Sequence, residues 1–219
     1  MHKPETNDEL PFEKALSLAN SLSVAANRNQ QQTELARKLY RQCLAARPEN
    51  FELRANYALL EMEIYEQEKK SSRGTCLPDH QQVIDCFEKA LLQNCNWWQG
   101  HYNIANIYMD LGPEGEGKAI FHLQRAANLQ DSDGDVFNNL SIVLMNTGRL
   151  QESLEYAKMA IRLDKDNLNF QLNIAELYSQ IGDVKRALFF SKKCAHQSST
   201  SNSTRTSIQA LKLLASLYE

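Results

Sequence analysis

Four asparagines recur along the chain at intervals that suggest a shared role in binding. Asn56, Asn103, Asn139 and Asn173 are separated by 47, 36 and 34 residues, and each stands two residues before an alanine or a serine. A carboxamide offers both a hydrogen-bond donor and an acceptor, which suits binding of the backbone of an extended peptide. The alternative interpretation is that these side chains form a polar face in contact with water. Both interpretations place the four asparagines at matching positions of a repeated structure.

The rest of the sequence carries no arrangement of residues typical of catalysis or of a metal or cofactor site. It lacks a nucleophile elbow, an HExxH motif, a phosphate-binding loop and paired carboxylates in a plausible cleft. The five cysteines show neither C-x2-C nor C-x4-C spacing, and the five histidines are scattered. An odd number of cysteines without a secretion signal argues against a disulfide framework. We therefore expect no enzyme activity within these residues, no cofactor and no metal.

The elements that position the asparagines are predicted to be helical hairpins. In residues 134–167, apolar residues at helical spacing predict a first helix, Gly148 predicts a tight turn, and small residues predict a second helix packed closely on the first. Two series of small residues repeat this register, each with steps of 47, 36, 34 and 34 residues: Ala36, Val83, Ala119, Ser153 and Ala187, and Cys43, Ala90, Ala126, Ala160 and Cys194. The expected turn glycines, Gly112, Gly148 and Gly182, keep the last two intervals.

The hairpin of residues 134–167 resembles the tetratricopeptide repeat, whose pattern is W-x2-L-G-x2-Y followed by A-x3-F-x2-A. The positions that match this pattern are Phe137, Leu140, Ser141, Leu144, Ser153, Ala157 and Ala160. The resemblance covers nearly the whole chain, from about Phe12 to Glu219. It implies an all-α fold, a right-handed α-solenoid of stacked helical hairpins, in which the first helices line a concave groove.

The resemblance also predicts how the chain is divided. We expect a polar tail at 1–11, repeats at 12–50, 51–97, 98–133, 134–167 and 168–201, a connector at 202–207 and a lone first helix at 208–219. The first repeat is degenerate, with helices expected from Phe12 to about residue 27 and from Thr33. The lone last helix carries an apolar face of Leu211, Leu214 and Leu217, so we expect it either to cap the array or to begin an incomplete sixth repeat in a parent protein that continues past Glu219.

The second repeat is expected to contain an inserted loop at about 66–78. Its first helix should end near Gln67, and the polar segment from Lys69 to Pro78 should be a mobile surface loop. Ser71 and Ser72 follow two lysines there and could be phosphorylated, although such sequences are common in solvated loops. Asp79 should restart the helix and form an approximate capping box with Gln82.

The resemblance implies a protein-interaction module that binds a partner peptide or helix in the groove. In the family's dicarboxylate clamp for heat-shock chaperone tails, Asn106 and Asn139 would fit, but Tyr102, Asn169 and Asn173 occupy the basic positions, so a chaperone tail is disfavoured. The four recurring asparagines match instead the asparagine ladder of O-GlcNAc transferase. Two classes of function therefore remain, a scaffold or adaptor and the substrate-recruiting arm of a larger enzyme, such as a glycosyltransferase with its catalytic domain beyond Glu219.

Trp97 and Trp98 are a second candidate for partner binding, because tryptophan is favoured in the cores of interfaces. Paired aromatic residues at a repeat junction more often seal one repeat against the next. His101 should point into the same junction, as a packed and hydrogen-bonded histidine.

Composition and charge agree with a helical protein-binding protein. The chain has 8 Gly, 5 Pro and 42% hydrophobic residues, and its net charge of −3 gives no support for a uniformly basic surface that binds nucleic acid. It contains neither a signal-peptide core nor an apolar run long enough to span a membrane. The expected location is the cytoplasm, with the nucleus as an alternative and without membrane association.

Overall fold

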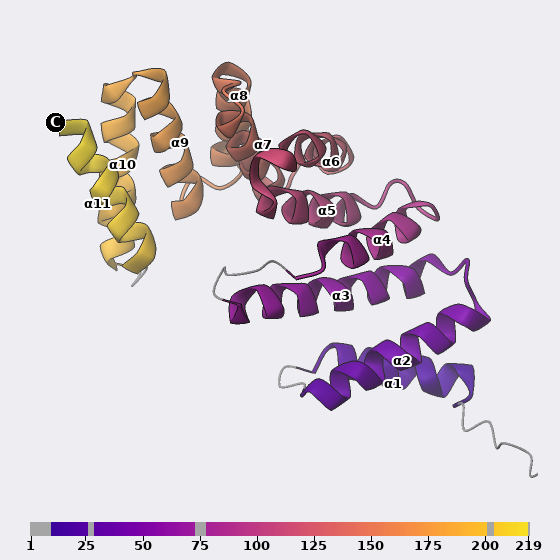
Figure 1. Ribbon diagram of the computed structural model, residues 1–219. Coiled ribbons are helices and arrows are strands. Elements are labelled where there is room, and N and C mark those ends of the chain that lie inside the picture. The colour runs from indigo at the N-terminus through magenta and orange to yellow at the C-terminus, as the bar shows by residue number, and fades with distance from the viewer. Residues whose placement is uncertain (1–9, 26–28, 73–77, 201–203, 219) are drawn as a thin grey trace, which may run out of the picture. The chain divides into compact units, whose positions relative to one another are not determined.

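The computed structural model describes residues 10–25, 29–72, 78–200 and 204–218, which form eleven α-helices and one 3-10 turn with no strand among them (Figure 1). The prediction of an all-α fold is thereby confirmed. The chain forms two compact units, residues 1–103 and 104–219, and the boundary falls within α5 (Trp98–Asp110). Each unit has its own set of packed helices.

The first unit is built from two helical hairpins and the beginning of α5. Its complete helices are α1 (Phe12–Ser23), α2 (Gln30–Ala46), α3 (Phe51–Ser71) and α4 (His80–Leu91). Helix α1 packs on α2, α2 contacts α3, and α3 packs on α4. The main apolar cluster of this unit joins α1, α2 and α3 through buried residues, which are Ala15, Ala19, Ala36, Leu39, Tyr40, Cys43, Leu53, Leu60 and Ile64.

The second unit continues the same arrangement to the end of the described chain. After the 3-10 turn η1 (Gly112–Glu114) its helices are α6 (Glu116–Leu129), α7 (Gly134–Asn146), α8 (Leu150–Leu163), α9 (Leu168–Ile181), α10 (Val184–Thr200) and α11 (Thr204–Tyr218). Each helix from α6 to α11 packs against the next, and the first helices α7 and α9, and α9 and α11, also contact one another. A first helix therefore meets both its own second helix and the first helix of the following repeat.

Small side chains allow the two helices of a hairpin to approach closely. All ten residues of the two series of small positions are buried. The contact is most direct in residues 134–167, where Ser153 Oγ donates to the carbonyl of Ser141 at 2.7 Å. The expected turn glycines Gly112, Gly148 and Gly182 have φ angles of 64°, 75° and 87°, a left-handed backbone that glycine adopts without steric cost.

Helix caps correct two of the expected boundaries in the first repeat. Helix α2 begins at Gln30 rather than Thr33, because Asn29 and Gln32 form a capping box in which each side chain accepts from the other's backbone N–H at 2.9 Å. Helix α1 ends at Ser23 instead of near residue 27. The linker is therefore set by a cap that the pattern of apolar residues does not reveal, and residues 26–28 lie outside the described part.

The expected loop of the second repeat is shorter than predicted. Helix α3 continues through Lys69 and Lys70 to Ser71, four residues past Gln67, with an ion pair of 3.6 Å between Glu66 and Lys69 in its last turns. Residues 73–77 lie outside the described residues, so mobility of this segment stays a prediction. Asp79 caps α4 by accepting from the backbone N–H of Gln82, as expected.

The C-terminal part also differs from the prediction. The expected connector at 202–207 is largely helical, because α10 runs to Thr200 and α11 begins at Thr204, and only 201–203 lie outside the described residues. The buried side of α11 is formed by Ala210 and by Leu213 and Leu217, which pack on neighbouring clusters. Leu211, expected on the apolar face, is 57% exposed, since it lies on the opposite side of the helix from that line.

Candidate functional site

In the first unit, Asn56 lies beside a second asparagine in a pocket between the first helices α1 and α3. The pocket has a volume of about 250 Å³ and is lined by Asn20, Ser23, Val24, Asn56, Leu59, Leu60 and Glu63. Asn20 and Asn56 also line a second pocket of about 220 Å³ between the same two helices. The two carboxamides are therefore shared by adjoining hollows on one face of this unit.

A buried tyrosine orients one of these carboxamides. The hydroxyl of Tyr40, on α2, donates to Asn20 Oδ1 at 2.8 Å and lies 3.2 Å from Ser23 Oγ. Because this bond uses the oxygen of Asn20, it directs the amide nitrogen toward use as a donor. Asn56 is exposed, and the neighbouring Leu59 and Leu60 give the pocket an apolar side. This combination can bind a peptide carbonyl and cover an apolar side chain. Asn20 was missed at the sequence level because it belongs to the degenerate first repeat.

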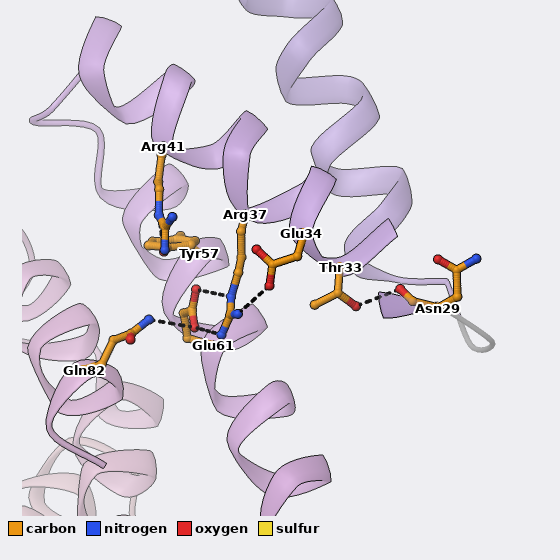
Figure 2. Close-up of polar contacts among 8 residues, drawn as sticks. All are labelled: Asn29, Thr33, Glu34, Arg37, Arg41, Tyr57, Glu61 and Gln82. Carbon is orange, nitrogen blue, oxygen red and sulfur yellow. Dashed lines mark hydrogen bonds and ion pairs between the residues drawn. The ribbon is translucent and has the colours of Figure 1, made fainter. Parts of the chain in front are cut away.

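A polar cluster behind this face ties α2, α3 and α4 together (Figure 2). Arg37 on α2 forms a two-point ion pair with Glu61 on α3, with Nε donating to Oε1 at 3.0 Å and Nη2 to Oε2 at 2.7 Å. Gln82 on α4 donates to Glu61 Oε2 at 3.3 Å, and Glu34 accepts from Arg37 Nη1 at 2.9 Å. Gln82 therefore does not complete the expected capping box through its side chain but reaches Glu61 instead. The ionic hydrogen bonds raise the pKa of Arg37 further above its usual range.

Tyr57 connects this cluster to Asn56, its neighbour in sequence. The Nε of Arg41 donates to the hydroxyl of Tyr57 at 3.0 Å (Figure 2). Burial and the nearby Glu61 carboxylate raise the pKa of Tyr57 to about 12, so the phenol stays neutral at physiological pH. The cluster thus fixes the turn of α3 that presents Asn56 on the other side of the helix.

In the second unit the ladder asparagines bind other asparagines. Asn139 Nδ2 on α7 donates to Asn106 Oδ1 on α5 at 2.9 Å, and Asn173 Nδ2 on α9 donates to Asn138 Oδ1 on α7 at 2.8 Å. Each pair links the first helices of successive repeats. Only part of the hydrogen-bonding capacity of Asn139 and Asn173 is therefore available to a partner, since one amide hydrogen of each is already used. Asn138 was not predicted, because its neighbour in sequence carried the repeat signal.

A further pocket of about 410 Å³ lies between α9 and α11. It is lined by Glu176, Ser179, Gln180, Gln209, Lys212, Leu213 and Ser216. Burial raises the pKa of the half-buried Glu176 carboxyl. The first-helix face of the second unit is therefore polar, with paired asparagines on α5, α7 and α9 and a charged pocket beside α11.

The paired tryptophans have different surroundings. The ring of Trp97 stacks on Phe87 at 5.5 Å and meets Phe51 edge-on at 5.6 Å, while Trp98 is in edge contact with Tyr102 at 6.4 Å. His101 is buried, with Nε2 3.4 Å from the carbonyl of Cys95. These contacts support a sealing role for Trp97 at the junction between the second and third repeats. Asn103, the remaining ladder position, is half-buried in α5.

The family model of the tetratricopeptide repeat matches residues 134–167. These residues form a tetratricopeptide repeat. The chain is also similar to solved structures of such proteins over most of its length. MamA from Desulfovibrio magneticus RS-1 is 15% identical, with a TM-score of 0.71 over 87% of this chain and 98% of that chain. YrrB, described as a TPR protein with an unusual peptide-binding site, is 18% identical, with a TM-score of 0.68 over 93% and 98% of the two chains.

A third similar structure is TTC0263, a thermophilic TPR protein of Thermus thermophilus. It is 15% identical, with a TM-score of 0.59 over 94% of this chain and 100% of that chain. No curated protein matches the sequence significantly. At these identities the likeness establishes the fold, and the tetratricopeptide-repeat resemblance inferred from the spacing of small residues is confirmed at that level.

Other kinds of site find little support in the described residues. They contain no group of three or more His, Cys, Asp or Glu side chains placed to hold a metal ion. Within the same residues, Cys43, Cys86, Cys95 and Cys194 are free thiols. No helix in the described ranges is long and apolar enough to cross a bilayer.

Proposed function

We propose that this chain is a non-catalytic interaction module that binds an extended segment of a protein partner on the faces of its first helices. The observation that carries the proposal is the pair Asn20 and Asn56, which line two adjoining pockets between α1 and α3. A peptide backbone bound there would receive hydrogen bonds from the carboxamides, and an apolar side chain would rest on Leu59 and Leu60. A scaffold and the substrate-recruiting arm of a larger enzyme would use the same binding step.

The proposal extends to the first helices that follow, with a modified role for their asparagines. The sites proposed there are Asn103, Asn106, Asn139 and Asn173, with Trp98 as an additional contact beside Trp97. Because Asn139 and Asn173 each donate to another asparagine, a partner would use the remaining groups of a paired carboxamide. We therefore expect the first unit to contribute more binding free energy per asparagine than the second.

The test selects a peptide and then removes the carboxamides. Peptides captured from a random display library on the immobilised chain would be synthesised with a fluorophore, and their Kd measured by anisotropy. Each hydrogen bond from an asparagine contributes about 0.5 to 1.5 kcal/mol, so the double variant Asn20→Ala with Asn56→Ala should weaken binding by roughly tenfold. Asn128→Ala, an exposed asparagine on the second helix α6, is the matched control and should leave the Kd unchanged.

Circular dichroism distinguishes a loss of contacts from a loss of fold. Asn56 is exposed and Asn20 half-buried, so both variants should keep the helicity and melting temperature of the parent to within a few degrees. If the folded double variant binds as tightly as the Asn128→Ala control, the pockets between α1 and α3 are not the binding site and the proposal fails.

A further inference from the structure

The end of the sequence has a charge opposite to that of the rest. Residues 184–218 contain six lysines and arginines and no aspartate or glutamate: Lys185, Arg186, Lys192, Lys193, Arg205 and Lys212. Because the whole chain has a net charge of −3, the remaining residues together carry −9. Within residues 104–183, twelve acidic residues accompany six basic ones. An abrupt reversal of this kind produces a local positive field, which attracts acidic partners although the protein as a whole is acidic.

Helix α10 arranges part of this charge around an exposed aromatic ring. Lys185, Phe189, Lys192 and His196 follow one another at intervals of four, three and four residues, so they form a line about 16 Å long on one side of the helix. All four are exposed, and Phe189 exposes 63% of its surface. Arg186 and Lys193 lie beside this line. These six residues are called the basic-aromatic face of α10 below.

The core anchors the ring of Phe189. It makes an edge contact with Phe190 at 5.2 Å, and Phe190 stacks on the buried Tyr178 of α9 at 5.9 Å. The guanidinium of Arg186 lies 5.5 Å from the centre of the Tyr178 ring. An exposed aromatic side chain that is already held in place loses little conformational entropy when a partner covers it, which is typical of an interface anchor.

Two carboxylates border the basic-aromatic face. Asp183 lies 3.0 Å from Arg186, and Asp166 lies 3.7 Å from Lys193. Since four lysines and arginines are set against these two acids, the face keeps a net positive charge. Helix α10 packs against α9 and α11 in the orange to yellow part of Figure 1, so the line of exposed residues is on the side that neither neighbour covers.

An equivalent position on another second helix offers a comparison. Phe121 on α6 lies 68 residues before Phe189, a distance of two repeats, and is 54% exposed. It also stands between two cations, Lys118 and Arg125, but α6 belongs to the acid-rich residues 104–183. At the intermediate position, α8 has Glu155. Phe121 therefore reproduces the exposed ring without the acid-free surroundings.

We propose that the basic-aromatic face of α10 binds an acidic protein segment that carries an apolar side chain. Carboxylates of the segment pair with Lys185 and Lys192, and the apolar side chain covers Phe189 between them. A bilayer surface fits less well because an interfacial helix needs a broad apolar face, whereas one ring is exposed here amid cations. Nucleic acid fits less well because a few cations neutralise too few phosphates for firm binding, and phosphates give no reason for an apolar anchor. The site lies on a second helix and is thus additional to the first-helix faces proposed above.

The experiment measures fluorescence anisotropy of a labelled acidic peptide, rich in glutamate with one central leucine, on the full chain at low and at physiological salt. We expect binding that weakens as salt rises. The double variant Lys185→Glu with Lys192→Glu should lose roughly tenfold or more in affinity, since two attractions become repulsions. Phe189→Ala should lose severalfold with the salt dependence kept, and Phe121→Ala should bind as the parent does.

Further probes separate the possible occupants. A peptide with glutamine in place of glutamate, and one with alanine in place of the central leucine, should both bind more weakly than the parent peptide. A single-stranded oligouridine and vesicles of phosphatidylserine with phosphatidylcholine should compete poorly. The proposal is overturned if either competes better than the acidic peptide, if Phe121→Ala costs as much as Phe189→Ala, or if the folded Lys185→Glu, Lys192→Glu chain binds normally. The Asn20→Ala, Asn56→Ala chain should bind the acidic peptide normally, so failure of one proposal leaves the other measurable.

Discussion

Removal of the Arg37 guanidinium should destabilise the first unit far more than removal of an exposed charge. The Glu61 side chain is 1% exposed and that of Arg37 is 18% exposed, and two hydrogen bonds of 3.0 and 2.7 Å join them. Arg37→Ala would leave a buried carboxylate with Gln82 as a partial replacement donor. Breaking a buried ion pair from one side costs about 3 to 5 kcal/mol, and the partial exposure of Arg37 favours the lower end.

This loss is large compared with the stability of a small domain, which is about 5 to 15 kcal/mol. A matched exposed pair is Arg47 with Glu13, whose atoms are 3.5 Å apart and whose side chains are 55% and 78% exposed. Glu13→Gln should therefore cost no more than about 1 kcal/mol. The contrast follows from desolvation, because water can solvate Arg47 after the change but reaches Glu61 poorly.

Urea unfolding followed by tryptophan fluorescence suits this prediction. Both tryptophans of the chain, Trp97 and Trp98, lie in the first unit, and Trp97 is stacked on Phe87. The midpoint should fall for Arg37→Ala, with an unchanged slope if unfolding of the unit remains a single step. Replacing both charges, as in Arg37→Met with Glu61→Met, should recover much of the loss because no unpaired charge is then buried. The reasoning is refuted if Arg37→Ala shifts the midpoint no more than Glu13→Gln does.

Two further predictions concern ionisation. The pKa of Tyr57 is raised to about 12 by burial and by Glu61, while an unfolded tyrosine titrates near 10. The unfolded chain loses this proton first, so the stability contributed by neutral Tyr57 is complete below pH 10 and disappears between pH 10 and about 12. Tyr57→Phe should remove the latest step in an ultraviolet titration of tyrosinate, and an unchanged titration would contradict the assignment. Burial also raises the pKa of Cys86 to about 11, whereas Cys95 is exposed. Iodoacetamide at neutral pH should therefore modify Cys95 well before Cys86 in a mass-spectrometric time course, and similar rates would show that Cys86 is open to solvent.

Part of the candidate site could be predicted from the sequence, and its limits have physical causes. The recurrence of Asn56, Asn139 and Asn173 places them on first helices because a repeat keeps each residue at the same place in its hairpin. Their hydrogen-bond partners could not be predicted in the same way. Whether Asn173 meets Asn138 or solvent depends on how far one helix is shifted along the next, and no residue within a single repeat determines that shift.

The sequence alone determined the hairpin fold and the register of its tight packing. Small residues at helical spacing and glycine at each turn act locally, through how closely two helices can approach and which backbone angles are allowed. Ser153 and Gly148 could therefore be assigned from residue type and spacing. The helix boundaries around Ser71 and Thr204 could not, because polar residues suit a solvated helix end as well as a loop.

Only the tertiary structure decided where polar groups are buried. Glu61 stands in a helix with no marked apolar face in its sequence, yet it is enclosed by Arg37 from 24 residues before it and Gln82 from 21 residues after it. Asn20 became part of a pocket because Tyr40 of the next helix holds its oxygen. A charge or carboxamide can be buried only where partners from other helices replace water, and those partners are brought together by packing rather than by neighbouring residues in the sequence.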